Sequence, residues 1–152
     1  MKGIGLWAIG VGGLVSVGLL TAQPAHSWEQ SGPKSCSNAT LKGLYMFAQS
    51  GYTTVSGALV PEGVTGQDVI YGNGTFDSLA TISIGGSIIP GDAAPGTYTV
   101  NSDCTGTLTV HMTPPVPDVH LDIFVAPDGD AYYTIQTDPG NVLAGVIRRV
   151  AP

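Results

Sequence analysis

The sequence contains few charged residues, and basic residues are especially scarce. Only 11% of its 152 residues are Asp, Glu, Lys or Arg, and five basic residues face eleven acidic ones. Binding to nucleic acid or to an anionic membrane surface needs positive charge that displaces counterions. This balance argues against both kinds of partner.

The chain also lacks the sequence patterns of common enzyme chemistries. It has no Gly-x-Ser-x-Gly elbow, and its glycines precede no helical pattern that would cradle a phosphate. The two carboxylates of Asp128-Gly129-Asp130 flank a glycine, which is typical of a hairpin turn, and they stop too soon for a calcium loop. We recognise no catalytic set and expect no cofactor.

Histidine is equally scarce, and this bears on metal binding. Beyond residue 27 the chain has only His111 and His120, and Asp122 shares a strand face with His120. Three or four converging ligands would be needed for a metal site. Because Leu121 and Ile123 alternate with this pair, we expect the polar face to be exposed to solvent and to hold no metal.

The N-terminus carries a secretory signal pattern. Lys2 gives a positive start, residues 4–20 carry no charged side chain, and Ala25-His26-Ser27 matches a small-x-small cleavage site. The pattern predicts cleavage after residue 27 and export to the periplasm or the extracellular space. The alternative is an uncleaved membrane anchor. No later segment is long and apolar enough to span a bilayer, so we expect no membrane association after cleavage.

Only two cysteines are present, Cys36 and Cys104. In an exported chain such a pair is most simply one disulfide, which closes a long loop and stabilises the fold by roughly 4 kcal/mol. The alternative, a reactive or metal-binding thiol, lacks a histidine near either cysteine.

The rest of the chain reads as short strands joined by turns, with no helical stripe. Residues 28–40 form an irregular lead-in, and residues 41–152 form one all-β domain. The predicted turns are Pro90-Gly91-Asp92, residues 101–106, Pro114 to Pro117, Asp128-Gly129 and Asp138-Pro139-Gly140. We place Asn73-Gly74 as a bulge or bend within a strand over 67–79, and Gly85-Gly86 as an interruption within a strand over 80–89. The order of residues 52–64 stays open.

The strand spacing suits either a closed antiparallel barrel or a β-sandwich. Strand lysines, which would protect exposed edges, are absent, and only closure removes the edges altogether. We therefore predict a barrel of eight antiparallel strands with one disulfide.

Several sequence blocks resemble exported bacterial proteins of the allene oxide cyclase barrel-like family. They are Leu41-Lys42-Gly43-x-Tyr45-x-Phe47, Gly74-x-Phe76-Asp77, residues 96–106, and residues 137–145 with Thr137-Asp138-Pro139-Gly140. The resemblance covers residues 36 to about 149. It implies an eight-stranded, calycin-like barrel and export, and the wider superfamily includes both cyclases and binding proteins. No catalytic position of the plant cyclase maps onto this chain.

Aromatic side chains on the predicted strands suggest a ligand site. A barrel would bring Tyr45, Phe47, Tyr98, Tyr132 and Tyr133 around one axis, where they either fill the core or contact one small molecule. Arg148 and Arg149 point to opposite faces, so at most one of them enters the lumen. The candidate ligand contacts are Tyr45, Phe47, Tyr98, Tyr133 and Arg148.

Three functions stay open at this point. The leading one is a non-enzymatic protein that binds a small, largely apolar molecule in or at the mouth of the barrel. The second is an isomerase or cyclase acting on such a molecule. The third is a structural or surface-interaction protein with a solid core and an exposed apolar outer wall. An interior cavity above about 300 Å³ would favour the first two.

Overall fold

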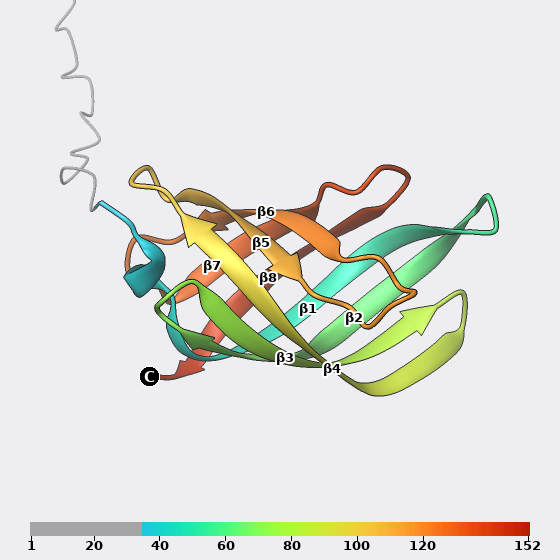
Figure 1. Cartoon of the computed structure of the whole chain (residues 1–152), viewed down its shortest axis with the longest axis horizontal. Helices are drawn as coiled ribbons and strands as arrows, with labels where there is room; N and C mark the ends of the chain where they lie inside the picture. Colours follow the sequence, from blue (N-terminus) through green and yellow to red (C-terminus); the bar gives the residue numbers. More distant parts are fainter. Residues whose placement is uncertain (1–34) are drawn as a thin grey trace, which may run out of the picture.

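The computed structural model describes residues 35–152 and shows an all-β protein (Figure 1). The predicted signal peptide, residues 1–27, lies outside the described residues. A short 3₁₀ turn, η1 (Asn38–Thr40), precedes eight strands: β1 (Lys42–Val55), β2 (Ala58–Tyr71), β3 (Thr75–Ile84), β4 (Ser87–Val100), β5 (Thr105–Val110), β6 (Val119–Val125), β7 (Ala131–Gln136) and β8 (Val142–Ala151). Within residues 35–152, no helix is long and apolar enough to cross a membrane.

The strands form a closed barrel in which every strand pairs antiparallel with its neighbour in sequence. The seam between the first and last strands closes the ring, with Tyr45 opposite Arg149 and Tyr52 opposite Val142. Because β1 and β8 pair along nine positions, all strands of residues 35–152 belong to one closed sheet. The predicted eight-stranded barrel is confirmed, and the sandwich alternative is excluded.

Alternation along each strand separates a buried lumen from the outer wall. On β6, Leu121, Ile123 and Val125 are buried, whereas His120, Asp122 and Phe124 are exposed. This is the period-two pattern that a strand with one buried face requires. The lumen is filled mainly by aromatic and branched side chains: Tyr45, Phe47, Ile70, Phe76, Tyr98, Leu108, Leu121, Ile123, Tyr132 and Ile147.

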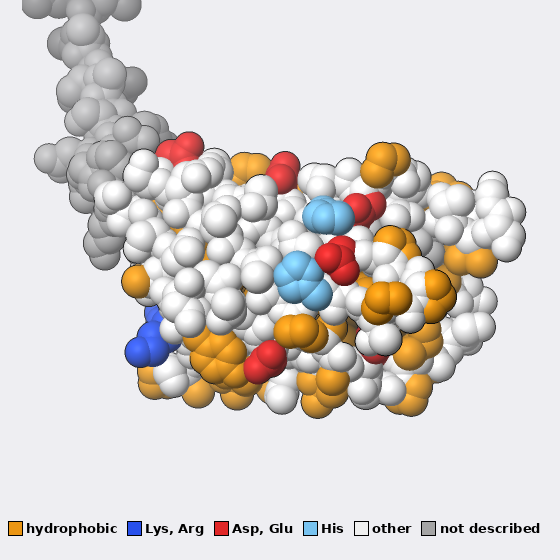
Figure 2. Space-filling model, in the orientation of Figure 1, with side chains coloured by type: hydrophobic (Ala, Val, Ile, Leu, Met, Phe, Trp, Pro, Cys, Tyr) orange, Lys and Arg blue, Asp and Glu red, His pale blue; other side chains and the backbone are white. Residues whose placement is uncertain are grey.

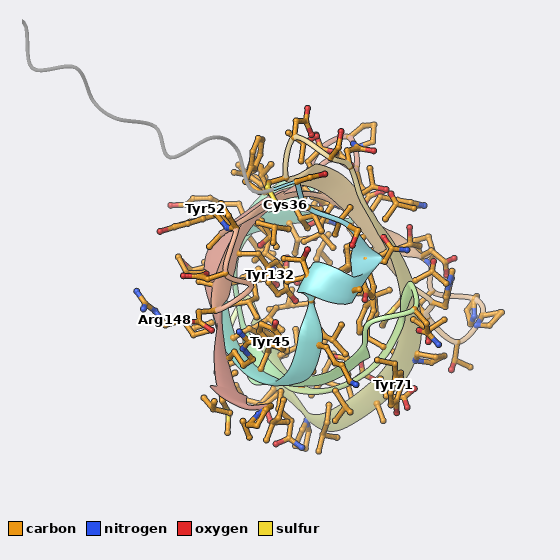
Figure 3. All side chains as sticks on the ribbon, turned by 90° about the vertical axis from the view of Figure 1, so that its left-hand side faces the viewer. Cys36, Tyr45, Tyr52, Tyr71, Tyr132 and Arg148 are labelled. Carbon is orange, nitrogen blue, oxygen red and sulfur yellow. A yellow bond between two sulfur atoms is a disulfide. The ribbon has the colours of Figure 1, made fainter. Side chains whose placement is uncertain are left out.

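One end of the barrel is closed by the segment that precedes β1. In the view down the barrel, η1 lies across this end (Figure 3). Leu41 is fully buried there, and the Tyr98 hydroxyl lies 2.9 Å from the Asn38 carbonyl oxygen and 3.0 Å from that of Leu41. Asn38 also accepts a hydrogen bond from the Val100 N–H at 2.8 Å. The lead-in, predicted to be irregular, therefore contains a turn that plugs the barrel.

The predicted disulfide joins Cys36 to Cys104 and fixes this plug to the turn between β4 and β5. The Cys36 N–H also donates to the Ser102 carbonyl oxygen at 3.3 Å. The covalent link and the plug therefore act at the same end of the molecule.

The opposite end of the barrel is open and asymmetric. Strands β1, β2 and β4 have 14 residues each, whereas β5, β6 and β7 have six or seven. The β1–β2 and β3–β4 hairpins therefore project beyond the other strands (Figure 1). Their inner faces form one wall of the barrel mouth.

Three predictions about connections in the first half were wrong. The Asn73-Gly74 pair lies in the turn between β2 and β3, and Gly85-Gly86 is the turn between β3 and β4. The residues Pro90-Gly91-Asp92 lie within β4, where the register against β3 shifts between Ala80 and Ile82. A bulge tolerates proline and positive-φ glycine inside a strand, so the chain does not turn there.

Candidate functional site

The lumen contains a small, partly open cavity of about 40 Å³. This is room for a few water molecules at most, since one water occupies about 10–15 Å³ by this kind of measure. The cavity walls are mixed in character, with polar side chains at one level and apolar ones around them. They comprise Phe47, Gln49, Asp68, Phe76, Ser78, Leu108, Val110, Leu121, Tyr132, Thr134 and Ile147.

Asp68 is the charged group of this cavity. It lies on β2 two residues before the buried Ile70, so alternation points its side chain into the lumen, and only 5% of the residue is exposed. Burial raises the pKa of the Asp68 carboxyl to about 6, although hydrogen bonds with Ser78 and Tyr132 lower it in part. Ser78 is its direct cross-strand neighbour on β3. The carboxyl therefore changes charge close to neutral pH.

Tyr132 faces Asp68 from the other side of the barrel. It is fully buried, and its hydroxyl donates to Asp68 Oδ2 at 3.2 Å. Burial, followed by the nearby Asp68 charge, raises the pKa of the Tyr132 phenol well above its ordinary value. The ring also makes an edge-on contact with Tyr45, with centroids 5.7 Å apart. Tyr132 is therefore a neutral hydrogen-bond donor that is held in one position.

A second polar pair lies at the same level. Gln49 Nε2, on β1, donates to Thr134 Oγ1, on β7, at 2.8 Å. Thr134 is buried and Gln49 is half-buried. Asp68, Tyr132, Gln49 and Thr134 together present hydroxyl, amide and carboxyl groups to one cavity, and we call these four residues the polar cluster.

The mouth above the cavity carries a further acid. Glu62 on β2 has the same inward parity as Asp68, and burial raises the pKa of its carboxyl. The half-buried Val60, Val64 and Ile82 accompany it on the inner faces of the projecting hairpins. Of the three basic residues within 35–152, Lys42, Arg148 and Arg149, none lines the cavity.

Three of the five predicted ligand contacts lie inside the barrel. Tyr45, Phe47 and Tyr98 are all buried. The Tyr45 hydroxyl donates to the Gly129 carbonyl oxygen at 2.6 Å, and that of Tyr98 is held by the plug. Phe47 alone lines the cavity. The two tyrosines therefore close one end of the lumen, and ligand contact by Phe47 stays a prediction.

The other two predicted contacts, Tyr133 and Arg148, lie on the outside. Tyr133 is 55% exposed, and Arg148 points away from the barrel (Figure 3). Tyr132 and Arg149 instead occupy the strand positions that face inward. The Arg149 guanidinium donates to Asp130 and to the Asp128 carbonyl oxygen. The structure therefore places Tyr133 and Arg148 outside the lumen and not around the barrel axis, and ligand contact by either residue stays a prediction.

Sequence reasoning missed most of the polar cluster. Asp68, Gln49 and Thr134 were not candidates, and Tyr132 was named only among the core aromatics. A signal was present, because Asp68 occupies the apolar parity of β2 together with Val64 and Ile70. An acid on the apolar face of a strand is costly unless it is paired, so it marks a special site.

The two histidines of residues 35–152 lie on the outer surface, which was the expectation for His120, and each contacts an acid (Figure 2). His111 Nδ1 is 2.9 Å from Asp118 Oδ2, and His120 Nδ1 is 2.8 Å from Asp138 Oδ1. In the described part of the chain, no three His, Cys, Asp or Glu side chains are grouped for metal binding.

Comparisons with known proteins find no matching family model, no matching curated protein and no matching solved structure.

Proposed function

We propose that this protein is exported and binds a small, largely apolar molecule at the mouth of its barrel. The polar end of the molecule would reach the polar cluster, and its apolar part would lie against the inner faces of the projecting hairpins. The observation that carries the proposal is the partly open cavity with Asp68, Tyr132, Gln49 and Thr134 at one level. A pocket with a few convergent polar groups and a perturbed pKa is the usual form of a binding site.

The size of the cavity restricts how the molecule lies. A site that encloses a whole drug-sized ligand needs about 300 Å³ or more, whereas this cavity has about 40 Å³. The lumen therefore admits one polar group or a few atoms. The remainder of the ligand would occupy the mouth, where Val60, Val64 and Ile82 are only half-buried.

The charge of the mouth restricts the chemistry of the polar end. Glu62 and Asp68 face inward, and none of the basic residues that the structure describes lines the cavity to balance them. A carboxylate or phosphate would meet two acids in a poorly solvated site, which is unfavourable. An alcohol, a carbonyl or an amine would find both hydrogen-bond donors and acceptors.

A second candidate function, an isomerase or cyclase, is supported by Asp68 itself. A carboxyl with a pKa of about 6 beside a cavity is suited to moving a proton near neutral pH. The resemblance to the allene oxide cyclase barrel-like family, which we also propose, is compatible with either function. Export is supported by the signal pattern and by the Cys36–Cys104 disulfide, since such bonds persist outside the cytoplasm.

A titration with 1-octanol and with octanoate tests the binding proposal. The two ligands share a chain length and differ in the charge of the polar end. We expect octanol at pH 7.5 to shift the amide NMR signals of residues 49, 68 and 134, and octanoate to bind at least about tenfold more weakly. Thr134→Val, which removes a hydroxyl from the polar cluster, should weaken octanol binding.

The matched control is Thr107→Val, which makes the same change on the outer face of β5. It should leave octanol binding unchanged. Neither ligand shifting the three signals, or octanoate binding as well as octanol, would contradict the proposal.

A further inference from the structure

The outer wall of the barrel carries a second feature that the lumen site leaves unused. Six large apolar side chains on β6, β7, β8 and β1 point outward and are between 36% and 55% exposed. We call them the apolar wall: Met46, Tyr52, Phe124, Tyr133, Ile135 and Val142. Soluble proteins rarely leave a contiguous group of large apolar side chains exposed unless the group contacts a partner.

The strand register shows that the apolar wall is continuous. Phe124 lies opposite Tyr133 across β6 and β7, and Tyr133 lies opposite Val146 across β7 and β8. Tyr52 lies opposite Val142 across the barrel seam. Small residues, Ala48 and Ala144 among them, occupy the positions between these large side chains.

The apolar wall carries one basic residue and is bordered by one acidic residue. Arg148 lies beside Met46 on the seam, and Asp122 lies beside Ile135 on β6. Within the described residues, neither side chain has an ion pair or a side-chain hydrogen bond. Figure 3 shows Arg148 and Tyr52 pointing outward on the same flank, that of β8.

Arg148 and Asp122 are too far apart to pair within one molecule. Their neighbours on β7 are Ala131 and Ile135, four residues apart, and the two strands lie on either side of β7. At about 3.4 Å per residue along a strand and about 4.8 Å between strands, the backbone separation is roughly 17 Å. The two charges therefore occupy opposite corners of the wall.

We propose that the apolar wall is the interface of a homodimer with two-fold symmetry. In such an interface the same surface faces itself, and a residue at one corner can meet a residue at the opposite corner of the second copy. A two-fold axis in the plane of the wall, diagonal to the strands, brings Arg148 of each copy to Asp122 of the other. Self-association thus pairs both charges while it buries the apolar side chains.

The area of the apolar wall is compatible with a second copy of the chain as its partner. Four strands measure about 20 Å across and eight residues about 25 Å along, which is roughly 500 Å² in projection. A standard interface uses about 800 Å² from each partner, with an apolar core and a polar rim. The wall therefore supplies the apolar core of such an interface, with Arg148 and Asp122 at two of its corners.

The charge of the chain argues against a membrane as the occupant. Eleven acidic residues and five basic ones repel an anionic bilayer, and the wall itself has only one cation. A second copy of the chain offers an acid for Arg148 and a base for Asp122 at the spacing that the wall itself has.

Sedimentation at several concentrations tests this proposal. The protein is expressed as the full chain, purified in its processed form, and its N-terminus is read by mass spectrometry. We expect a monomer–dimer equilibrium at micromolar concentrations. Tyr133→Ser should weaken the dimer at least about tenfold, because central aromatic anchors dominate interfaces.

Exchanging the charges of Arg148 and Asp122 tests the proposed pairing more specifically than Tyr133→Ser does. Arg148→Glu alone and Asp122→Arg alone should each weaken the dimer, and the two together should restore it. Thr81→Glu is the control, since it adds a charge to the outer face of β3, away from the wall. All four substituted positions, including Tyr133, are exposed, and a thermal melt of each variant verifies that it folds.

Three results would overturn the proposal. The first is a monomer at every concentration up to about 0.5 mM. The second is a dimer that Tyr133→Ser leaves unchanged, and the third is single charge variants that the double variant does not rescue. Binding of the monomer to phosphatidylcholine vesicles, lost in Tyr133→Ser, would assign the wall to a lipid instead.

Discussion

At the scale of single residues, Asp68 places a carboxyl on the inward face of β2, next to apolar side chains. Its neighbours of the same parity on β2 include Val64 and Ile70, and each of these is apolar. The barrel accommodates the acid by placing Ser78 and the Tyr132 hydroxyl beside it. Burial nevertheless raises its pKa, so the folded protein holds a proton on Asp68 that the unfolded chain releases.

This difference predicts a stability that falls as the pH rises. Between about pH 4 and pH 6 the folded state binds one more proton at Asp68 than the unfolded state does, because the pKa moves from 3.8 to about 6. We expect the group to make the protein about 2 kcal/mol less stable at pH 7 than at pH 4. Asp68→Asn, which keeps an acceptor for Tyr132, should remove that part of the pH dependence.

Denaturant unfolding of the wild type and the variant at pH 4, 5, 6 and 7 measures the effect. The useful quantity is the difference between the two proteins, since other acids titrate in the same range. Asp77→Asn is the matched control, because that carboxyl is exposed on the outer face of β3, away from the apolar wall, and asparagine keeps an acceptor for the Tyr71 hydroxyl. Parallel stability curves for the wild type and Asp68→Asn would show that the carboxyl is not buried as described.

Where two adjacent residues are of the same type, the sequence alone does not show which of them faces the lumen. Alternation states that Tyr132 and Tyr133 face opposite sides, and likewise Arg148 and Arg149, but it does not say which one faces inward. The outcome depends on register, which the pairing of Tyr132 with Ile147 and of Tyr133 with Val146 fixes only once the barrel closes. For this reason Tyr133 and Arg148 were chosen from the sequence, although both side chains lie on the outer face.

At the scale of elements, β6 to β8 could be read from the sequence, and β2 to β4 could not. The second half has strong turn signals such as Asp128-Gly129, which precedes β7 as predicted. In the first half, Asn73-Gly74 and Gly85-Gly86 are turns, whereas Pro90-Gly91 belongs to a bulge. Local chemistry permits both outcomes at each of these sites, and the pairing of long strands decides between them.

Close packing between strands predicts that alanine substitutions at two strand glycines have different effects on stability. A Cβ added at Gly96, on β4, would lie 2.0 Å from the Phe76 ring and 2.7 Å from the Thr109 carbonyl oxygen. We expect Gly96→Ala to destabilise the barrel by about 1–3 kcal/mol, because Phe76 is buried and cannot move freely. Chemical denaturation of the variant measures this.

Gly63→Ala on β2 is the comparison, since an added Cβ there meets nothing within 4 Å. It should be neutral or slightly stabilising, by up to about 1 kcal/mol, because alanine restricts the unfolded chain. Equal losses at the two positions would mean that strand propensity, and not contact with Phe76, controls the result.

At the scale of the whole molecule, composition and turn spacing predicted an all-β domain but left barrel and sandwich open. The scarcity of strand lysines and the family resemblance then favoured the barrel. The closed barrel and the Cys36–Cys104 pair were both expected and are both present. The size of the interior was not predictable, because it depends on how the side chains of eight strands meet. Phe76, Tyr132 and their neighbours leave only about 40 Å³.

The disulfide predicts a loss of stability that applies to the whole barrel. It joins residues 68 positions apart and ties the plug to the β4–β5 turn. Replacing both cysteines by alanine should lower the free energy of unfolding by roughly 4 kcal/mol, since the unfolded chain gains the freedom of that loop. Thermal and denaturant unfolding of the double variant, compared with the wild type in oxidising buffer, measures it. An unchanged midpoint would mean that the plug alone holds this end closed.

The seam between β1 and β8 has a consequence for how the chain folds. Seven of the eight strand pairings join consecutive strands, whereas the seam joins residues such as Leu44 and Ala151, which are 107 positions apart. Closing so long a loop costs more entropy than forming a hairpin, so we expect the hairpins to form first and the ring to close last. Truncations on the seam, such as Val146→Ala, should therefore speed unfolding while leaving the refolding rate almost unchanged, which stopped-flow chevron plots would reveal.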